Sequence, residues 1–372
     1  MRNLKTQNQL KIRKDNELIL LLSRSELKNN ELSRVEDLFK EDLDWSYIFE
    51  RSKQEGVACL LYQHLKKVPL KDFVPVETEE ALKNTYYSNS LRNASIYAEI
   101  KKLLQVFNVE KIKIVILKGI FLAENIYKNI ALRPMTDVDI LIKKEDFAKV
   151  NEILNSLGYF SVMNYMEVLQ NPFSYCITFS PKNPDNFNSF SIDVHWHILS
   201  STWMMGFLSG RIDMERVWHQ AEPVKIDAID TFALCSEHLL IYLSLHGFSH
   251  SFDRMLLLTD IIETLTHYNG RLAQDRVREE AEIMGVENIL SYSLYFAFKK
   301  LGFQSAARNK FTLSGAGFER KAMDFLINNG KINLSCLVYI LTKEKFRDKL
   351  KLMARAGSLL SYLINRNFNT PA

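Results

Sequence analysis

The sequence predicts an α+β protein, in which a small mixed-sheet domain is flanked by helical regions at both ends. Short β-branched runs typical of strands, beginning with Lys111–Leu117, are confined to the middle of the chain. Apolar residues at helical spacing precede and follow that part. The length of 372 residues suits two or three domains. We expect an N-terminal helical region at residues 1–85, an α/β domain at residues 86–225 and a C-terminal helical domain at residues 226–372.

Composition and charge indicate a globular protein, since 47% of the residues are hydrophobic and 25% are charged. The net charge of +4 leaves a nucleic-acid partner possible but does not favour one. The four cysteines form no C-x-x-C pair, which predicts reduced thiols rather than a zinc knuckle. No run approaches the ~20 apolar residues that span a bilayer, and Leu18–Leu22 is too short for a signal peptide. We therefore expect a cytoplasmic protein, of an oligomeric state that the sequence leaves open.

Helical segments lead into the α/β domain. Residues 16–66 carry apolar positions at helical spacing, and Asp44 is placed to cap one of these helices. Pro69 and Pro75 predict a loop. A long helix is expected at residues 79–108, because its late apolar positions recur every three or four residues.

The α/β domain is predicted to run in the order strand, helix, strand, helix, strand, strand. Its expected elements are strand Lys111–Leu117, helix Phe121–Tyr127, strand Val138–Ile142, helix Lys144–Leu157, and strands Tyr175–Phe179 and Phe190–Trp196.

Helices are expected again in the C-terminal part of the chain. Their predicted ranges are Thr231–Gly247, Arg254–Tyr268, Arg271–Met284, Asn288–Leu301 and, last, a segment at Ala322–Asn365. Within this last segment, Lys343–Arg355 is basic and amphipathic. We interpret it as a solvated helix face, with contact to RNA, anionic lipid or an acidic partner as the alternative.

Two carboxylates near the start of the second predicted strand form the first candidate site. On a strand, Asp137 and Asp139 point to one face, with Cα atoms roughly 6.6 Å apart at ~3.3 Å rise per residue. At an effective dielectric of ~20, two charges at about that separation repel by roughly 2–3 kcal/mol. A cation reverses this effect, and Mg²⁺ prefers carboxylate oxygens. The alternative is a strand end with two solvated acids.

A third carboxylate lies on another predicted strand, where Asp193, His195 and His197 share one face. Two carboxylates on one strand and a third on a neighbour are the usual arrangement for two metal ions that assist in-line attack at phosphorus. The same segment can also be interpreted as a D-x-H-x-H set of zinc ligands, which would favour a metal-dependent hydrolase. We prefer the interpretation in which His195 lies near phosphate groups or packs.

Together these residues resemble the nucleotidyltransferase superfamily, the fold of DNA polymerase beta and of aminoglycoside nucleotidyltransferases. More closely, the chain is similar to a bacterial group of uncharacterised nucleotidyltransferases. Helical flanks on both sides extend the resemblance over roughly residues 16–300. The motifs that support it are Leu117-Lys118-Gly119, Arg133-Pro134-Met135-Thr136-Asp137-Val138-Asp139-Ile140-Leu141 and Asp193-Val194-His195-Trp196.

The resemblance implies a role for each motif residue. The carboxylates that would hold Mg²⁺ and act in catalysis are Asp137, Asp139 and Asp193. The residues that would bind the NTP are Lys118, Gly119, Arg133 and His195. The chain departs from the superfamily pattern at Ile120, where a Gly or Ser is usual, so we expect phosphate contacts from backbone N–H groups and from Lys118 or Arg133. The alternative for Arg133 is an ion pair with one of the acids.

The expected function is therefore Mg²⁺-dependent transfer of a nucleotidyl group from an NTP to an acceptor hydroxyl, of a small molecule or a protein side chain, with release of pyrophosphate. Three alternatives remain: a nucleotide-binding regulator without turnover, a hydrolase that uses Asp193, His195 and His197, and a helical interaction protein. Neither a P-loop nor a G-x-S-x-G elbow is present, and His246 and His250 lack the Glu of an H-E-x-x-H helix. The sequence identifies neither the acceptor nor the base of the nucleotide.

Overall fold

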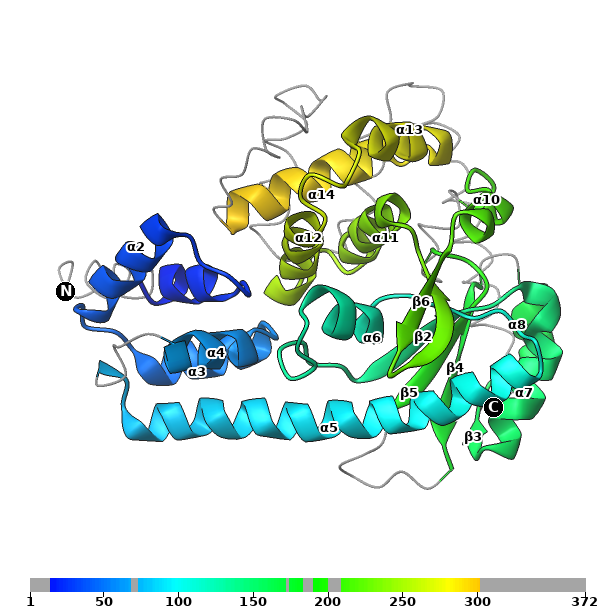
Figure 1. Cartoon of the computed structure of the whole chain (residues 1–372), viewed down its shortest axis with the longest axis horizontal. Coiled ribbons are helices and arrows are strands. Elements are labelled where there is room, and N and C mark those ends of the chain that lie inside the picture. The colour runs from blue at the N-terminus through cyan, green and yellow to red at the C-terminus, as the bar shows by residue number, and fades with distance from the viewer. Residues whose placement is uncertain (1–13, 68–72, 172–173, 183–189, 200–208, 302–372) are drawn as a thin grey trace, which may run out of the picture.

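The computed structural model describes residues 14–67, 73–171, 174–182, 190–199 and 209–301 (Figure 1). A mixed sheet occupies the middle of the chain, with helical regions before and after it, so the predicted α+β class is confirmed. Within the described ranges, no helix combines the length and the apolar character needed to cross a bilayer. The predicted segment Ala322–Asn365, including basic Lys343–Arg355, lies outside the described residues.

The N-terminal region consists of helices, as predicted. Residues 14–22 are helical, and the helices that follow are α2 (Asn29–Phe39), α3 (Trp45–Gln54) and α4 (Ala58–Lys67). The side chain of Asp44 caps α3 by accepting the backbone N–H of Tyr47 at 3.0 Å, which confirms its predicted role. The long helix α5 (Val76–Val109), along the lower edge of Figure 1, begins three residues earlier than expected, directly after Pro75.

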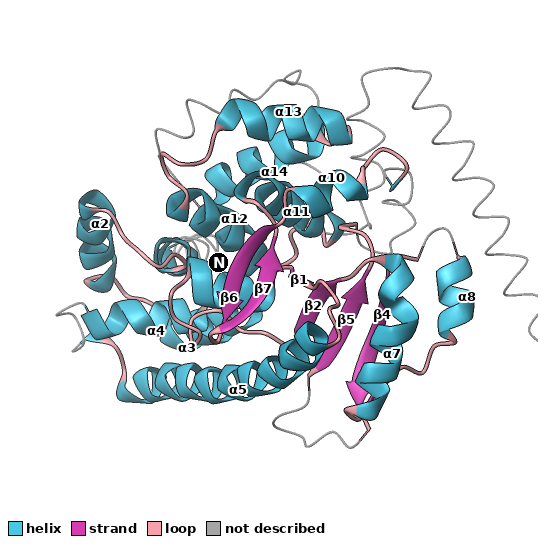
Figure 2. Cartoon of the chain, turned by 45° about the vertical axis from the view of Figure 1, so that its right-hand side comes forward, coloured by secondary structure: helices cyan, strands magenta, loops and turns pink. Residues whose placement is uncertain are grey.

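Among the described residues, seven strands form one sheet in the order β3-β4-β5-β2-β1-β7-β6 (Figure 2). Their bounds are β1 Val115–Ile116, β2 Asp137–Leu141, β3 Tyr159–Phe160, β4 Cys176–Pro181, β5 Ser191–His195, β6 Glu222–Ile226 and β7 Ile229–Ala233. The β2/β5 and β1/β7 pairs are parallel, and the other pairs are antiparallel. All four predicted strands are present. The helical elements between them are α6 (Gly119–Phe121) with the π-helical turn Leu122–Ile126, the 3₁₀ turn Lys144–Asp146 with α7 (Phe147–Ser156), α8 (Tyr165–Gln170) and α10 (Met214–His219).

The β6–β7 hairpin is a feature that the sequence did not predict. A helix was expected from Thr231, but β7 continues to Ala233 and the helix begins only at Ser236. The hairpin turns at Asp227 and Ala228, which both have positive φ (44° and 65°). Such turns favour Asn-Gly or Asp-Gly pairs, so the Asp-Ala pair gave no recognisable signal. The expected domain boundary at residues 225/226 falls inside this hairpin.

The C-terminal part of the described chain is helical, as predicted, and in both views α11–α14 gather on one side of the sheet. The bounds are α11 Ser236–Ser249, α12 Met255–His267, α13 Gln274–Met284 and α14 Glu287–Lys300. One continuous cluster of buried apolar side chains extends from Leu18 in the N-terminal region, through the sheet, to Leu301. The helical regions and the α/β unit therefore share a core.

A half-buried ion pair ties the α/β unit to these helices. Glu280 of α13 accepts two hydrogen bonds from the guanidinium of Arg216 on α10, at 2.6 and 2.8 Å, and one from Gln220 at 3.0 Å. His238 Nε2 lies 3.1 Å from the same carboxylate. These hydrogen bonds, led by those of Arg216, lower the pKa of Glu280 to about 2 against the opposing effect of burial.

Replacing Glu280 by Gln should lower the free energy of unfolding by about 1–3 kcal/mol at pH 7, because the bonds of Arg216 to a charged acceptor are lost. The carboxylate of Glu280 makes its full contribution to the free energy of unfolding above its ordinary pKa of 4.5. This contribution is lost as the pH falls toward the folded-state pKa of about 2. Urea unfolding at pH 7 and pH 3 measures both values, and the difference between wild type and variant should shrink at pH 3. Exposed Glu282→Gln on the same helix is the control, and equal loss in both variants would contradict the assignment.

Candidate functional site

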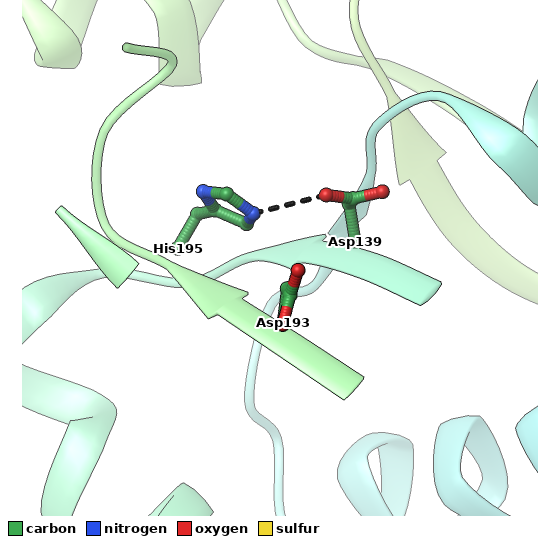
Figure 3. A group of neighbouring side chains, drawn as sticks. All are labelled: Asp139, Asp193 and His195. Carbon is green, nitrogen blue, oxygen red and sulfur yellow. Dashed lines mark hydrogen bonds and ion pairs between the residues drawn. The ribbon is translucent and has the colours of Figure 1, made fainter. Parts of the chain in front are cut away.

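The register of the parallel β2/β5 pair brings two of the predicted acids together. Asp139 on β2 is directly opposite Asp193 on β5, at the usual interstrand spacing of about 4.8 Å. Both side chains therefore lie on the same face of the sheet, and His195, two residues further along β5, shares that face. Figure 3 shows the three side chains converging from the two strands.

Asp139, Asp193 and His195 form a compact group in which one ligand atom from each residue lies within 4.8 Å of the others. His195 Nε2 donates a hydrogen bond of 3.1 Å to Asp139 Oδ1 (Figure 3). The side chain of Asp139 is only 2% exposed. A carboxylate this deeply buried needs compensating positive charge.

Lys118 supplies that charge. Its Nζ is 3.2 Å from Asp139 Oδ2, 3.8 Å from Asp137 Oδ2 and 3.4 Å from His246 Nε2 on α11. Burial alone would lower the pKa of Lys118, but Asp139 and Asp137 outweigh it and raise this pKa. In the same way, burial acts to raise the pKa of Asp139, whereas Lys118 and His195 hold it well below its ordinary value.

Two carboxylate oxygens of the group have unused acceptor capacity. Asp193 Oδ1 is buried without a hydrogen-bond partner among the described residues, and Asp139 Oδ2 has only its ion-pair contact with Lys118. Burial raises the pKa of Asp193, and the neighbouring Asp139 charge adds to this, while a hydrogen bond from Thr178 opposes it. A divalent cation would coordinate the unpartnered oxygen and offset the repulsion between the two carboxylates. These residues therefore fit a metal ion.

Asp137 lies apart from the compact group. Its side chain is 36% exposed, on the same face of β2 as Asp139 but at the start of the strand. Its contacts in the described structure are with Lys118 and, at 3.4 Å, with the hydroxyl of Thr136. The structure thus brings all three predicted acids to one cleft, two of them in direct register and the third toward its opening.

Arg133 is held by an acid that the sequence did not suggest. Its Nε and Nη2 donate to the two oxygens of Asp260 on α12, at 3.0 and 2.7 Å, and Tyr127 donates to the same carboxylate at 2.8 Å. This is the ion-pair alternative for Arg133, with Asp260 in place of Asp137 or Asp139. Arg133 also lines the cleft, so its contact with phosphate stays a prediction.

Gly119 begins α6 at a point where the chain is crowded. A Cβ there would lie 3.0 Å from the Met135 sulfur and 3.6 Å from Arg133 Nη1. The next residue, Ile120, is buried in the core. This packing explains why an apolar residue stands where the superfamily usually has a small or hydroxyl-bearing one. The contact of Gly119 with a nucleotide stays a prediction.

The cleft has a volume of about 300 Å³, at the lower end of the range for small-molecule sites. The sheet provides one wall, and α11 with the start of α12 provides the other. Burial and the Lys118 charge hold the pKa of His246 well below its ordinary value, so the ring is neutral and Nε2 can accept from Lys118. Residues on this second wall are Tyr242, His246, His250, Arg254, Leu256 and Leu257.

The sequence interpretation missed most of this second wall. Tyr242 and His246 on α11, and His250 at its C-cap, recur every four residues. That periodicity was the available signal. It places the three side chains on one helix face.

His197 is outside the group. β5 ends at His195, so the alternation of the strand does not extend to His197. Its Nδ1 accepts the N–H of Leu199 at 3.1 Å, its ring lies 5.0 Å from that of Tyr175, and burial lowers its pKa to about 4. The D-x-H-x-H zinc set is therefore not assembled among the described residues, and the hydrolase alternative lacks its third ligand.

A family model described as an uncharacterised nucleotidyltransferase matches residues 41–302. The match spans well over half of the chain, and it includes the sheet, both walls of the cleft and the helices α11–α14. No curated protein matches the chain.

Replacing Asp260 by Asn should lower the free energy of unfolding by about 3–5 kcal/mol, because it leaves the buried Arg133 guanidinium without its countercharge. Urea unfolding measures the change. Asp253→Asn, at an exposed position on the same segment (side chain 58% exposed), is the matched control and should change it by less than about 0.5 kcal/mol. A loss below about 1 kcal/mol in Asp260→Asn would show that the pair does not hold the loop before β2 in place.

Proposed function

The chain belongs to this nucleotidyltransferase family, and we propose that it transfers a nucleotidyl group from an NTP to an acceptor hydroxyl and releases pyrophosphate. The acceptor would be a small molecule or a protein side chain. The observation that supports this most directly is the pairing of Asp139 with Asp193 in register, next to His195 and open to a cleft. Phosphoryl chemistry needs this kind of carboxylate pair to place a cation beside the reacting phosphorus.

Asp139, Asp193 and His195 would hold the divalent cation. Mg²⁺ is the expected ion, because carboxylate oxygens dominate the group and Asp193 Oδ1 has no other partner among the described residues. When bound, this cation would offset the negative charge of the phosphates and lower the pKa of the acceptor hydroxyl. His195 Nε2 donates to Asp139 as the site stands, and to hold the cation this nitrogen would have to lose its proton and give up that hydrogen bond.

The residues of the chain suggest how the proton and the leaving group are handled. Asp193 lines the cleft and its Oδ1 has no hydrogen-bond partner among the described residues, so this carboxylate would accept the proton of the acceptor hydroxyl. The acceptor oxygen then bonds to the α-phosphorus, and the bond from that phosphorus to the bridging oxygen breaks, so that pyrophosphate leaves with the electron pair. Lys118 and Arg133 line the cleft, and their positive charge would stabilise the departing pyrophosphate. Gly119, at the start of α6, would leave room for the phosphate chain.

Incubation of the protein with each labelled NTP, Mg²⁺ and cell extract should transfer label to an acceptor and release pyrophosphate. Asp139→Asn and Asp193→Asn should each reduce the rate by about 10²-fold or more, because each removes a charge that would hold the cation against the phosphates. Thermal melting verifies that both variants are folded.

Asp230→Asn is the matched control, since this acid lies on β7 of the same sheet with its side chain 81% exposed. It should transfer label at the wild-type rate. The proposal fails if no NTP yields a labelled product, or if Asp139→Asn and Asp193→Asn remain as active as Asp230→Asn. Tight NTP binding without pyrophosphate release would instead support a nucleotide-binding regulator.

A further inference from the structure

The ammonium of Lys118 occupies the space between the two acids of the D-x-D motif. It lies 3.2 Å from Asp139 Oδ2 and 3.8 Å from Asp137 Oδ2, and its third neighbour is His246 Nε2 at 3.4 Å. An ammonium has three protons to donate and accepts none. Two ion pairs and one hydrogen bond thus surround the ammonium, in a place where its side chain is only 11% exposed.

The fold also fixes the backbone of Lys118. The preceding residue, Leu117, donates its N–H to the carbonyl of Asp139 at 3.1 Å, and the carbonyl of Lys118 accepts from Leu122 at 3.0 Å in the first turn of α6. The lysine is thus attached to the same strand whose carboxylates it neutralises. If its side chain left this position, Asp139 would lose its nearest full positive charge while it remained buried.

Asp139 consequently lies between two different cation positions. Its Oδ2 faces the Lys118 ammonium, and its Oδ1 faces His195, on the side of the compact group with Asp193. A second divalent ion between Asp137 and Asp139 would have to displace the ammonium from the same oxygens, because two cations repel at such short range. One ammonium and one divalent ion, in contrast, balance the charge of three carboxylates.

We propose that the protein holds a single divalent cation, on Asp139, Asp193 and His195, and that the Lys118 ammonium takes the place of a second one between Asp137 and Asp139. The proposal rests on the proposed function for the role of the site. Asp137 is then the partner of a lysine rather than a metal ligand. The sequence-based expectation of two metal ions on three acids is replaced by one metal ion and one built-in cation.

The number of bound cations can be measured by calorimetric titration of the full chain with Mn²⁺ alone. Electron paramagnetic resonance measures the free Mn²⁺ in the same samples. The wild-type protein should bind one Mn²⁺, and Lys118→Met, which keeps the side-chain length without the charge, should bind two. Asp137→Asn should still bind one, whereas Asp193→Asn should bind Mn²⁺ at least tenfold more weakly. Lys113→Met is the matched control, because Lys113 lies just before β1 and packs over the ring of Phe232; it should bind one.

Two Mn²⁺ in the wild type, or loss of the bound ion in Asp137→Asn, would overturn the proposal, and both results are obtained even if Lys118→Met does not fold. These outcomes are separate from the label-transfer assay. Two bound ions together with active transfer would refute only the single-cation arrangement. One bound ion without transfer would support that arrangement and refute the proposed function. No bound Mn²⁺ would refute the metal site in both proposals.

Discussion

The in-register parallel pairing of β2 with β5 is the constraint on which the rest of the structure depends. It sets Asp139 directly beside Asp193 on a buried face, where two like charges could not persist uncompensated. Two neighbouring side chains offset that repulsion, one on each side of Asp139. β1 ends where Lys118 reaches Asp139 from one side, and β5 continues to His195, which reaches it from the other. Burial acts to raise the pKa of both carboxyls, and the positive charge outweighs it only at Asp139, where Lys118 and His195 lower the pKa.

The segment that leads into β2 is held by one helix that precedes the strands in the sequence and by another that follows them. On α5, the amide of Asn93 donates to the carbonyls of Ile130 and Arg133. On α12, Asp260 binds the side chain of the same arginine. The helical regions are therefore part of the site, because they fix the loop that places Asp137 and Asp139 at the cleft. The continuous core agrees with this dependence.

Local sequence patterns were sufficient for four of the seven described strands, for most of the helices and for the shared face of Asp137 and Asp139. They could not predict the register between β2 and β5. A slip of two residues would leave every side chain on the same face of the sheet but would separate Asp139 from Asp193. Long-range partners were equally inaccessible: Asp260 lies 127 residues from Arg133 in the sequence. The prediction that His197 shares a face with Asp193 and His195 was wrong, because nothing in the sequence marked the end of β5 at His195. The family resemblance supplied the site residues where patterns alone left two interpretations.

The parallel pairing of β1 with β7 has a consequence for how the protein is made. Residues just before β1 bond to β7 across 117 positions of the chain, as in the hydrogen bond from the Thr231 hydroxyl to the carbonyl of Ile114. Contacts this distant in sequence form slowly, since the entropy of closing the loop must be lost before they contribute. During synthesis, β1 therefore cannot pair with β7 until the whole α/β segment has left the ribosome. The sheet is therefore completed late, and a nascent chain with an unpaired edge of β1 is exposed to misfolding until then.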